Sequence, residues 1–279
     1  MPAFRHNGHR IAYREFGSGP RTCVLIHGLL LSQLMHEPLA RDLAARGNRV
    51  VTIDLLGHGL SDRPREPWNY SIPGCAEQVV ALLEHLGLDE AVIGGMSLGA
   101  NAALEVCLLA PERVRAMVIE MPVLDHALIA CVVAFTPLLI GLKLGEPLLK
   151  LVARAARAVP RRALPLYGNV LLDTVRQEPG PSGAVIEGLF FGRVAPHPEQ
   201  RRTFEPPTLV IGHRRDPVHA LSDAGMLADE LPNARLLEAD SIIELRVRPE
   251  RLTTEIADFL DTCWKPARRA TGRRRASAS

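Results

Sequence analysis

The stretch Gly95-Met96-Ser97-Leu98-Gly99 decides how the rest of the chain is interpreted. It follows an apolar run at 91–93 and precedes a helix-like stretch at 98–109. A serine between two glycines, on a turn from strand into helix, is how a nucleophile is pushed out of the edge of a sheet. A side chain at either glycine would collide with the neighbouring strand or helix in so tight a turn. The stretch therefore predicts that Ser97 is a nucleophile at the end of a strand.

Strand-like and helix-like segments alternate on both sides of this turn. The predicted strands are 10–14, 23–27, 49–54, 91–96, 114–120, 208–212 and 234–238, and the predicted helices are 37–46, 73–86, 98–109, 221–230 and 249–260. Continuous apolar runs such as 24–26 and 209–211 are typical of strands covered on both faces, hence of a parallel sheet. The alternation predicts an α/β fold with a doubly wound, mostly parallel sheet and a ligand site at the carboxyl ends of its strands.

The alternation breaks between residues 122 and 204, where the pattern is helical and contains no convincing strand. We therefore expect a core of 1–121 and 205–264, with 122–204 inserted as a helical cap. Within it, Ala127–Leu142 carries no charge but is interrupted by Pro137, and it is too short for a membrane span. It is either a buried cap helix or an apolar lid that touches lipid or a long acyl chain.

The positive charges are unevenly distributed. The chain has a net charge of +2, and the acid-free segment 265–279 carries six lysines and arginines, so residues 1–264 carry −4. Such a segment predicts a disordered, solvated tail. The alternative is a tail that binds an anionic lipid or a nucleic acid, and of these two partners we do not expect the nucleic acid. Lys150, Arg154, Arg157 and Arg161 are expected on one helical face, either solvated or holding an anionic headgroup or phosphate. Contact with a membrane surface through the cap or the tail is thus an open expectation.

The five cysteines are far apart, odd in number and without a CxxC pair, which argues against a disulfide framework. Residues 1–10 lack the apolar run of a signal peptide. Both observations predict a cytoplasmic protein. The sequence contains no HExxH, GxGxxG or P-loop pattern, so we expect neither a metal nor a cofactor.

Four motifs together resemble the α/β-hydrolase fold family. His27-Gly28 follows the second predicted strand, Asp54–Asp62 has the form D-x-x-G-x-G-x-S after the next, and Gly95–Gly99 is the nucleophile elbow. Leu209–Gly212, followed by Asp216, resembles the strand and turn that carry the catalytic acid. The resemblance covers about residues 8–121 and 205–262 and leaves the cap unassigned. It is specific for the fold and much less so for the substrate.

The resemblance implies a role for individual residues. Ser97 would be the nucleophile, and the backbone N–H groups of Leu29 and Leu98 would form the oxyanion hole. Asp216 would orient the catalytic base, although an aspartate before a proline is also a common turn residue. Glu120 is an alternative acid, because some relatives place the acid after the preceding strand.

The base is missing from its usual place. Relatives carry a histidine about eight residues before the Pro-Glu that starts the last helix, and counting back from Pro249 gives Ser241. No histidine follows His219, and a serine cannot take a proton near pH 7 as an imidazole does. Either another histidine substitutes, or Ser97 works weakly without one, or the pocket binds a ligand without turning it over.

Three histidines are candidates for the catalytic base in place of a histidine at position 241. His219 is three residues after Asp216, at the end of the sheet where the site is expected, and it is the preferred candidate. It is equally compatible with a local pair at the start of a helix. His213 and, from the cap, His126 are the others.

The resemblance then implies a serine hydrolase acting on a carboxylic ester or related acyl substrate, with an apolar small molecule as the partner. A serine nucleophile argues against dehalogenase or epoxide-opening chemistry, for which relatives use a carboxylate. The alternative is a catalytically impaired ligand-binding protein. A membrane-associated or interaction protein is a third class.

Overall fold

A mixed β-sheet forms the centre of the protein. The computed structural model describes residues 1–190, 192–214, 216 and 218–265. Over these residues the sheet has eight strands: β1 (Ala3–His6), β2 (His9–Phe16), β3 (Thr22–Ile26), β4 (Arg49–Asp54), β5 (Ala91–Met96), β6 (Val114–Glu120), β7 (Thr208–His213) and β8 (Ala234–Ala239). Their order is β1-β2-β4-β3-β5-β6-β7-β8. Strands β1 and β2 pair antiparallel, β2 also pairs antiparallel with β4, and all other pairs are parallel.

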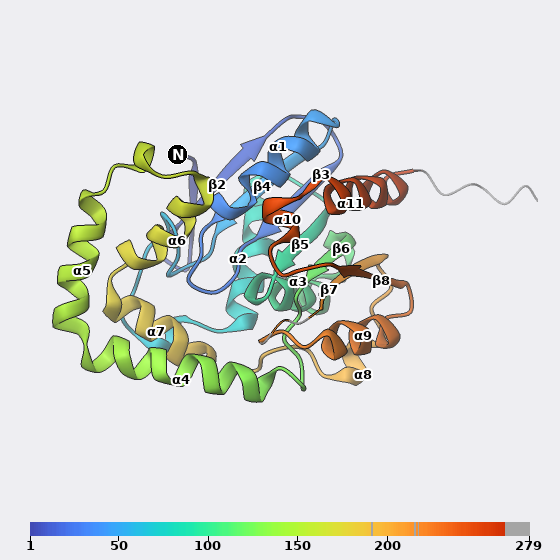
Figure 1. Ribbon diagram of the computed structural model, residues 1–279. Helices are drawn as coiled ribbons and strands as arrows, with labels where there is room; N and C mark the ends of the chain where they lie inside the picture. The colour runs from blue at the N-terminus through green and yellow to red at the C-terminus, as the bar shows by residue number, and fades with distance from the viewer. Residues whose placement is uncertain (191, 215, 217, 266–279) are drawn as a thin grey trace, which may run out of the picture.

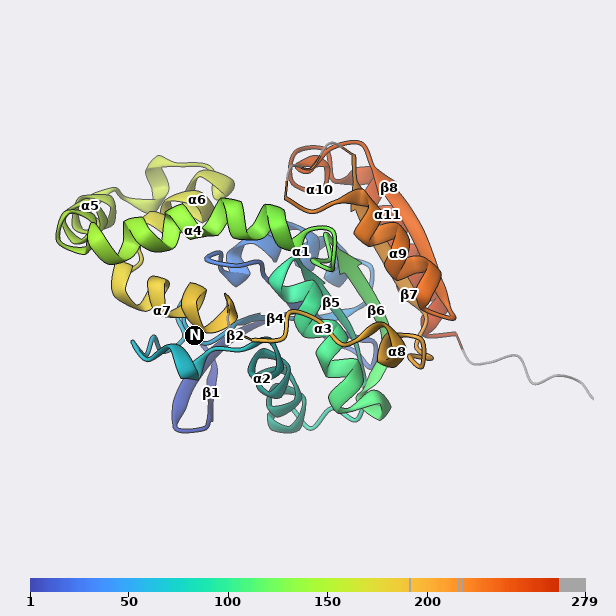
Figure 2. The same cartoon turned by 90° about the horizontal axis from the view of Figure 1, so that it is seen from below.

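Helices cover both faces of this sheet, as Figure 2 shows. The described helices are α1 (Glu37–Ala45), α2 (Ile72–His85), α3 (Leu98–Leu109), α4 (Leu128–Leu144), α5 (Glu146–Ala158), α6 (Leu166–Arg176), α7 (Pro179–Phe190), α8 (Pro198–Arg201), α9 (Leu221–Glu230), α10 (Glu244–Val247) and α11 (Glu250–Cys263). Helices α1 and α11 bury apolar side chains on one face, and α2, α3 and α9 bury theirs on the other. The predicted doubly wound α/β fold is confirmed.

Central strands β3, β4 and β5 are buried almost throughout, which explains why their sequences are continuous apolar runs rather than alternating ones. Strand β1 was not predicted. It forms a hairpin with β2 through Asn7-Gly8, whose φ angles are +48° and +82°. An Asn-Gly pair between two short runs is a strong hairpin signal, so this strand was recognisable from the sequence.

Between β6 and β7 the chain leaves the sheet and forms helices α4 to α8. Helices α4 to α7, which we call the inserted helices, lie together to one side of the sheet (Figure 1). The insertion was expected to be helical, and its described residues contain no strand. The interpretation of Ala127–Leu142 as a buried helix is wrong, because α4 has no buried residue.

The expected basic face also needs correction. Helix α5 ends at Ala158, and Arg161 begins a separate short 3-10 helix, Arg161–Ala163. Arg161 therefore does not continue the face that carries Lys150, Arg154 and Arg157, because the helix ends before it at Val159-Pro160. The predicted tail lies outside the described residues, apart from Lys265.

Candidate active site

Ser97 stands on a sharp turn between β5 and α3. Its backbone has φ +54° and ψ −113°, a strained conformation for a residue with a side chain. A Cβ on Gly95 would collide with the backbone of Gly99, and a Cβ on Gly99 would collide with the carbonyl of Ile26. Both glycines are therefore needed for the close packing of strand, turn and helix. The turn is fixed further by a 2.9 Å hydrogen bond from the Ser97 N–H to the carbonyl of Glu120.

His219 lies directly against Ser97, although 122 positions separate them in the chain. The distance from His219 Nε2 to Ser97 Oγ is 2.9 Å, and His219 Nδ1 lies 2.9 Å from Asp216 Oδ2. An ionised carboxylate only accepts, so Nδ1 donates to Asp216 and Nε2 is left to accept the Ser97 hydroxyl proton. The structure thus brings together Ser97, His219 and Asp216 in the order nucleophile, imidazole, carboxylate.

Asp216 is held in its ionised form by its hydrogen bonds. Its Oδ1 accepts from the backbone N–H groups of Val218, at 2.8 Å, and His219, at 2.9 Å. Burial by itself raises the pKa of Asp216, but the bonds from the His219 ring and from these two N–H groups outweigh it, so the pKa lies below its ordinary value. Asp216 is therefore a turn residue and the partner of His219 at once, which makes the two interpretations of the sequence compatible.

The other two candidate histidines point elsewhere. His126 Nδ1 lies 2.8 Å from the fully buried carboxylate of Asp223, which also accepts the N–H of His126. His213 Nδ1 donates to the backbone carbonyl of Ser241 at 2.8 Å. Ser241, at the place where relatives carry their histidine, thus contacts His213 through its main chain.

Glu120, the alternative acid, belongs to a separate buried cluster. Both of its carboxylate oxygens accept from Arg246, at 3.0 and 2.8 Å, and His213 Nε2 lies 3.4 Å from Oε1. Burial raises the pKa of Glu120, but the charge of Arg246 and the contact with His213 outweigh it and lower the pKa to about 2. Glu120 is thus neutralised by Arg246, and Asp216 is the carboxylate at His219.

The loop after β3 contributes Leu29 to the pocket that Ser97 and Leu98 also line. The N–H groups of Leu29 and Leu98 donate no hydrogen bond to another described residue, and Leu98 begins α3, where backbone N–H groups have no partner within the helix. Both amides are thus free to bind an anionic oxygen beside Ser97.

Thr174 of α6 and Gln177, directly after α6, hydrogen-bond to this loop, and no sequence motif indicated either residue. Leu30 has φ +59°, and its carbonyl accepts from Thr174 Oγ1 at 3.0 Å and from Gln177 Nε2 at 2.8 Å. The side-chain oxygen of Gln177 in turn accepts from Arg63 at 3.0 Å. Because Leu30 directly follows Leu29, these bonds fix the backbone that carries one of the two free amides.

The pocket at Ser97 has a volume of about 140 Å³ and is almost entirely apolar. Its lining residues are Leu29, Ile72, Ser97, Leu98, Asn101, Val123, Leu128, Cys131, Val132, Phe135, Ile186, Leu189, Phe190 and Val194. Asn101 is polar, but its amide nitrogen donates to the carbonyls of Val123 and Val194, both at 2.7 Å. The pocket therefore offers a hydrocarbon environment beside the hydroxyl of Ser97.

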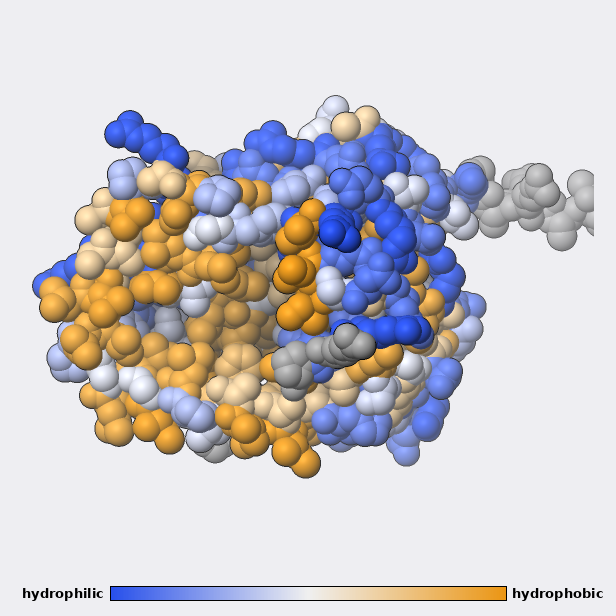
Figure 3. Space-filling model, viewed as in Figure 1, coloured by the Kyte–Doolittle hydropathy of each residue, from blue (hydrophilic) through white to orange (hydrophobic). Residues whose placement is uncertain are grey.

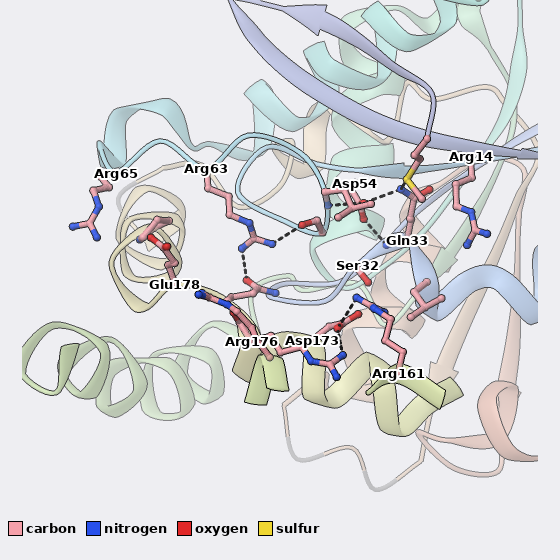
Figure 4. Close-up of a pocket in the computed structure, with 17 residues that line it drawn as sticks. Arg14, Ser32, Gln33, Asp54, Arg63, Arg65, Arg161, Asp173, Arg176 and Glu178 are labelled. Atoms are coloured by element: carbon pink, nitrogen blue, oxygen red, sulfur yellow. Dashed lines mark hydrogen bonds and ion pairs between the residues drawn. The ribbon is translucent and has the colours of Figure 1, made fainter. Parts of the chain in front are cut away.

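A larger cleft of about 880 Å³ is lined by Ser32, Gln33 and Leu34, and Ser97 is not among the described residues that line it. Arginines dominate its walls, and Figure 4 shows Asp173 bridged to both Arg161 and Arg176. None of the described residues that line this cleft is a serine in contact with an imidazole, whereas Ser97, which lines the small apolar pocket, contacts His219.

Among the described residues, no group of three or more His, Cys, Asp or Glu side chains is arranged to hold a metal ion. No single helix there is long and apolar enough to cross a membrane, whereas α4 and α5 together reach the required length and composition but are bent by 93° relative to each other.

A family model described as alpha/beta hydrolase fold matches residues 22–159 of this chain. Bifunctional epoxide hydrolase 2 of Sus scrofa is 37% identical over 110 residues, which are 39% of this chain and 20% of the pig protein. An epoxide hydrolase 2 of Siraitia grosvenorii is 34% identical over 114 residues, 40% of this chain and 35% of that protein. The chain therefore spans only about a fifth to a third of these curated relatives.

Solved structures match over nearly the whole chain. The enol-lactonase from Burkholderia xenovorans LB400 superimposes with a TM-score of 0.74 at 22% identity, covering 93% of this chain and 100% of that one. A hydrolase from Pseudomonas aeruginosa PA01 gives a TM-score of 0.76 at 22% identity, covering 93% and 97%. Similarity at this level of identity establishes the fold and leaves the substrate open.

Proposed function

Because this chain belongs to the α/β-hydrolase fold family, we propose that it is a serine hydrolase whose nucleophile is Ser97 and whose substrate is a carboxylic ester with an apolar acyl group. One observation carries the proposal: the 2.9 Å contact between His219 Nε2 and Ser97 Oγ, continued by the 2.9 Å contact between His219 Nδ1 and Asp216. An imidazole at this distance supplies the base that Ser241 cannot.

The reaction would begin with transfer of the Ser97 hydroxyl proton to His219 Nε2 as Oγ attacks the ester carbonyl. The negative charge that develops on the carbonyl oxygen would be stabilised by the N–H groups of Leu29 and Leu98. His219, now an imidazolium paired with Asp216, would return the proton to the departing alcohol oxygen. An acyl group esterified to Ser97 remains.

The second half returns the enzyme to its starting state. His219 Nε2 would take a proton from a water molecule, whose oxygen attacks the acyl carbonyl over the same two amides. Collapse of this second intermediate breaks the bond to Ser97 Oγ, which regains its proton from His219, and the carboxylic acid leaves. Asp216 keeps the imidazole in one tautomer and orientation throughout and stays ionised.

The lining of the pocket supports an apolar acyl group rather than a charged one. Leu128, Val132 and Phe135 of α4 face Ile186 and Leu189 of α7 across the space next to Ser97. A charged group placed there would lose its hydration without gaining a partner, which costs several kcal/mol, about 2–7 even for a neutral polar group. The acyl chain would therefore bind among these side chains.

Hydrolysis of a p-nitrophenyl ester series from acetate to laurate, with Ser97→Ala as the control, tests the proposal. We expect turnover that Ser97→Ala abolishes, and a rise in kcat/KM from acetate toward acyl chains that fill the pocket. A fluorophosphonate probe is expected to add its mass once to the wild type and not to Ser97→Ala, independently of substrate choice. Absence of both turnover and labelling would contradict the proposal and favour a ligand-binding protein.

An epoxide panel belongs in the same assay, because the matched curated relatives carry that activity in their names. We expect no epoxide turnover, since a serine stands at the nucleophile position. Epoxide opening that persists in Ser97→Ala would place the chemistry on another group.

A further inference from the structure

Helix α4 is apolar on all sides and yet exposed along its whole length. None of the residues from Leu128 to Leu144 is buried, and Ile129, Val133 and Leu144 are 77%, 69% and 82% exposed. Most of the exposed large apolar side chains of the described residues lie between 128 and 175. Figure 3 shows apolar side chains gathered on the side of the molecule where Figure 1 places the inserted helices. Apolar surface on this scale marks a contact surface.

Helix α5 continues this surface with an amphipathic pattern. Leu148 and Leu151 are 67% and 62% exposed, and Lys150, Arg154 and Arg157 lie on the same helix. A helix that combines exposed leucines with lysines and arginines on its polar side is the type that lies in the interface between water and lipid. In such an interface, lipid rather than another protein would cover the exposed leucines of α5.

The charge of the inserted helices selects among possible partners. Residues 128–190 carry seven lysines and arginines against four aspartates and glutamates, a net charge of +3. Asp173 and Glu146 each pair with two cations, and Glu187 pairs with Lys143, so these acids leave an excess of positive charge. A two-fold dimer through this surface would bring the same cations together. An anionic lipid surface would match both the charge and the apolar side chains.

The same helix also lines the pocket of the nucleophile. Leu128, Cys131, Val132 and Phe135 of α4 face the space beside Ser97, while Ile129 and Val133 of the same turns face outward. An apolar molecule that lies against the outward side of α4 is thus separated from Ser97 by the thickness of one helix. The arginine-lined cleft is lined by Arg157 of α5 but by no residue of α4.

We propose that α4 and α5 form a docking surface for an anionic lipid bilayer, on which they lie without crossing it. The 93° bend between the two helices fits two segments lying in one interface and does not fit a straight span. The docking itself does not depend on the proposed hydrolase activity. The corollary that ester substrates enter the pocket from the lipid does rest on it.

Flotation of the 279-residue chain with vesicles of phosphatidylcholine alone, or mixed with phosphatidylglycerol, tests the docking. We expect binding to the mixed vesicles, weaker binding to the neutral ones, and a loss at high salt. Ile129→Ser/Val133→Ser and Lys150→Ala/Arg154→Ala are each expected to weaken binding about tenfold or more. Leu109→Ser and Arg46→Ala, at exposed positions on the core, are the matched controls and are expected to bind as the wild type.

Ser97→Ala separates the two proposals, because it is expected to abolish hydrolysis and leave vesicle binding unchanged. The segment 265–279 is the second cationic region, so a chain ending at Trp264 is compared as well. Binding that this truncation abolishes and the α4 and α5 variants leave intact would overturn the proposal. So would a stable dimer, seen by sedimentation without vesicles, that Ile129→Ser/Val133→Ser dissociates, since it would make a second copy the partner. Circular dichroism checks that each variant is folded, and fluorophosphonate labelling adds a second check for the variants that keep Ser97.

Discussion

Two histidine–carboxylate pairs lie at the carboxyl ends of neighbouring strands, and they do different things. After β7, His219 and Asp216 are 2.9 Å apart and the free nitrogen of His219 faces Ser97. At the ends of β6 and β7, Glu120 and His213 are 3.4 Å apart, and both carboxylate oxygens of Glu120 accept hydrogen bonds from Arg246. The residue types are the same, so the third partner decides the chemistry: a hydroxyl in one case and a guanidinium in the other.

The surroundings of the two pairs reinforce this difference. The side chain of His219 is 18% exposed and contacts Ser97, which lines the apolar pocket, whereas the side chain of His213 is fully buried. Burial lowers the pKa of His213, but the contact with Glu120 and the Ser241 carbonyl outweigh it and raise the pKa above its ordinary value. A histidine that holds its proton more tightly beside a paired anion is suited to stabilise the fold rather than to accept a proton from a nucleophile. The following predictions test this division of roles.

Removing either member of the nucleophile–imidazole contact is expected to have the largest effect. Ser97→Ala and His219→Ala should each lower kcat by about 10⁵–10⁶-fold, and the double variant should lose no more than either alone. Steady-state ester hydrolysis and fluorophosphonate labelling measure both. His126→Gln is the control, because His126 is near the site but binds Asp223. Substantial activity in His219→Ala would return the role of base to an unidentified group.

Asp216→Asn is expected to lower kcat by about 10⁴-fold, because the amide can donate to His219 and favour the wrong tautomer. The wild-type carboxylate has a lowered pKa, so it stays charged as the pH falls through the ordinary range of an aspartate. Any fall in kcat caused by protonation of Asp216 should therefore occur only at a pH below the ordinary pKa of an aspartate. An Asp216→Asn variant that keeps its activity, together with a folded Glu120→Gln variant that loses it, would show that the two carboxylates had been assigned the wrong way round.

The fold and the sharp turn at Ser97 were predictable from the sequence because they depend on local patterns. The turn at Ser97 needs glycines at fixed spacing, and buried parallel strands need apolar runs. The pairing of His219 with Asp216 was a preference among three histidines. A separation of three residues placed His219 and Asp216 close together, but no sequence pattern indicates that the ring of His219 points toward Ser97.

The inserted helices were less predictable, for a physical reason. The uncharged stretch 127–142 indicates a helix that avoids water, and the same composition fits a buried helix and a lipid-facing one. Which one forms depends on what packs against it, and in the structure nothing buries α4. The contacts of Thr174 and Gln177 with Leu30 were likewise invisible, because they join residues about 145 positions apart that no motif connects.

A double variant, Thr174→Val/Gln177→Leu, is expected to have an intermediate effect. It removes both hydrogen bonds to the Leu30 carbonyl and leaves Ser97, His219 and Asp216 in place. Loosening the backbone next to Leu29 should weaken the binding of the oxyanion more than that of the ester, so we expect kcat to fall about tenfold with KM nearly unchanged. Asn169→Ala, which changes another buried amide of α6, is the control for a general disturbance of that helix. An equal rise in KM with no change in kcat would assign the two residues to substrate binding instead.

Glu120→Gln is expected to have the smallest effect on catalysis and a clear effect on stability. Breaking the buried pair with Arg246 leaves an uncompensated charge, which should lower the free energy of unfolding by about 3–5 kcal/mol while kcat changes less than about threefold.

The stabilisation by Glu120 is present above the unfolded-state pKa of a glutamate, near 4.3, and is lost as the pH falls toward the folded-state value of about 2. His213 has a raised pKa, so its contribution is complete below about 6.5 and is lost as the pH rises through its folded-state value. The difference in unfolding free energy between wild type and variant should therefore be largest near pH 5–6 and decline on both sides, as denaturant titrations over that range will measure. A large loss of kcat in a folded Glu120→Gln variant would mean that this pair, too, acts on the reaction.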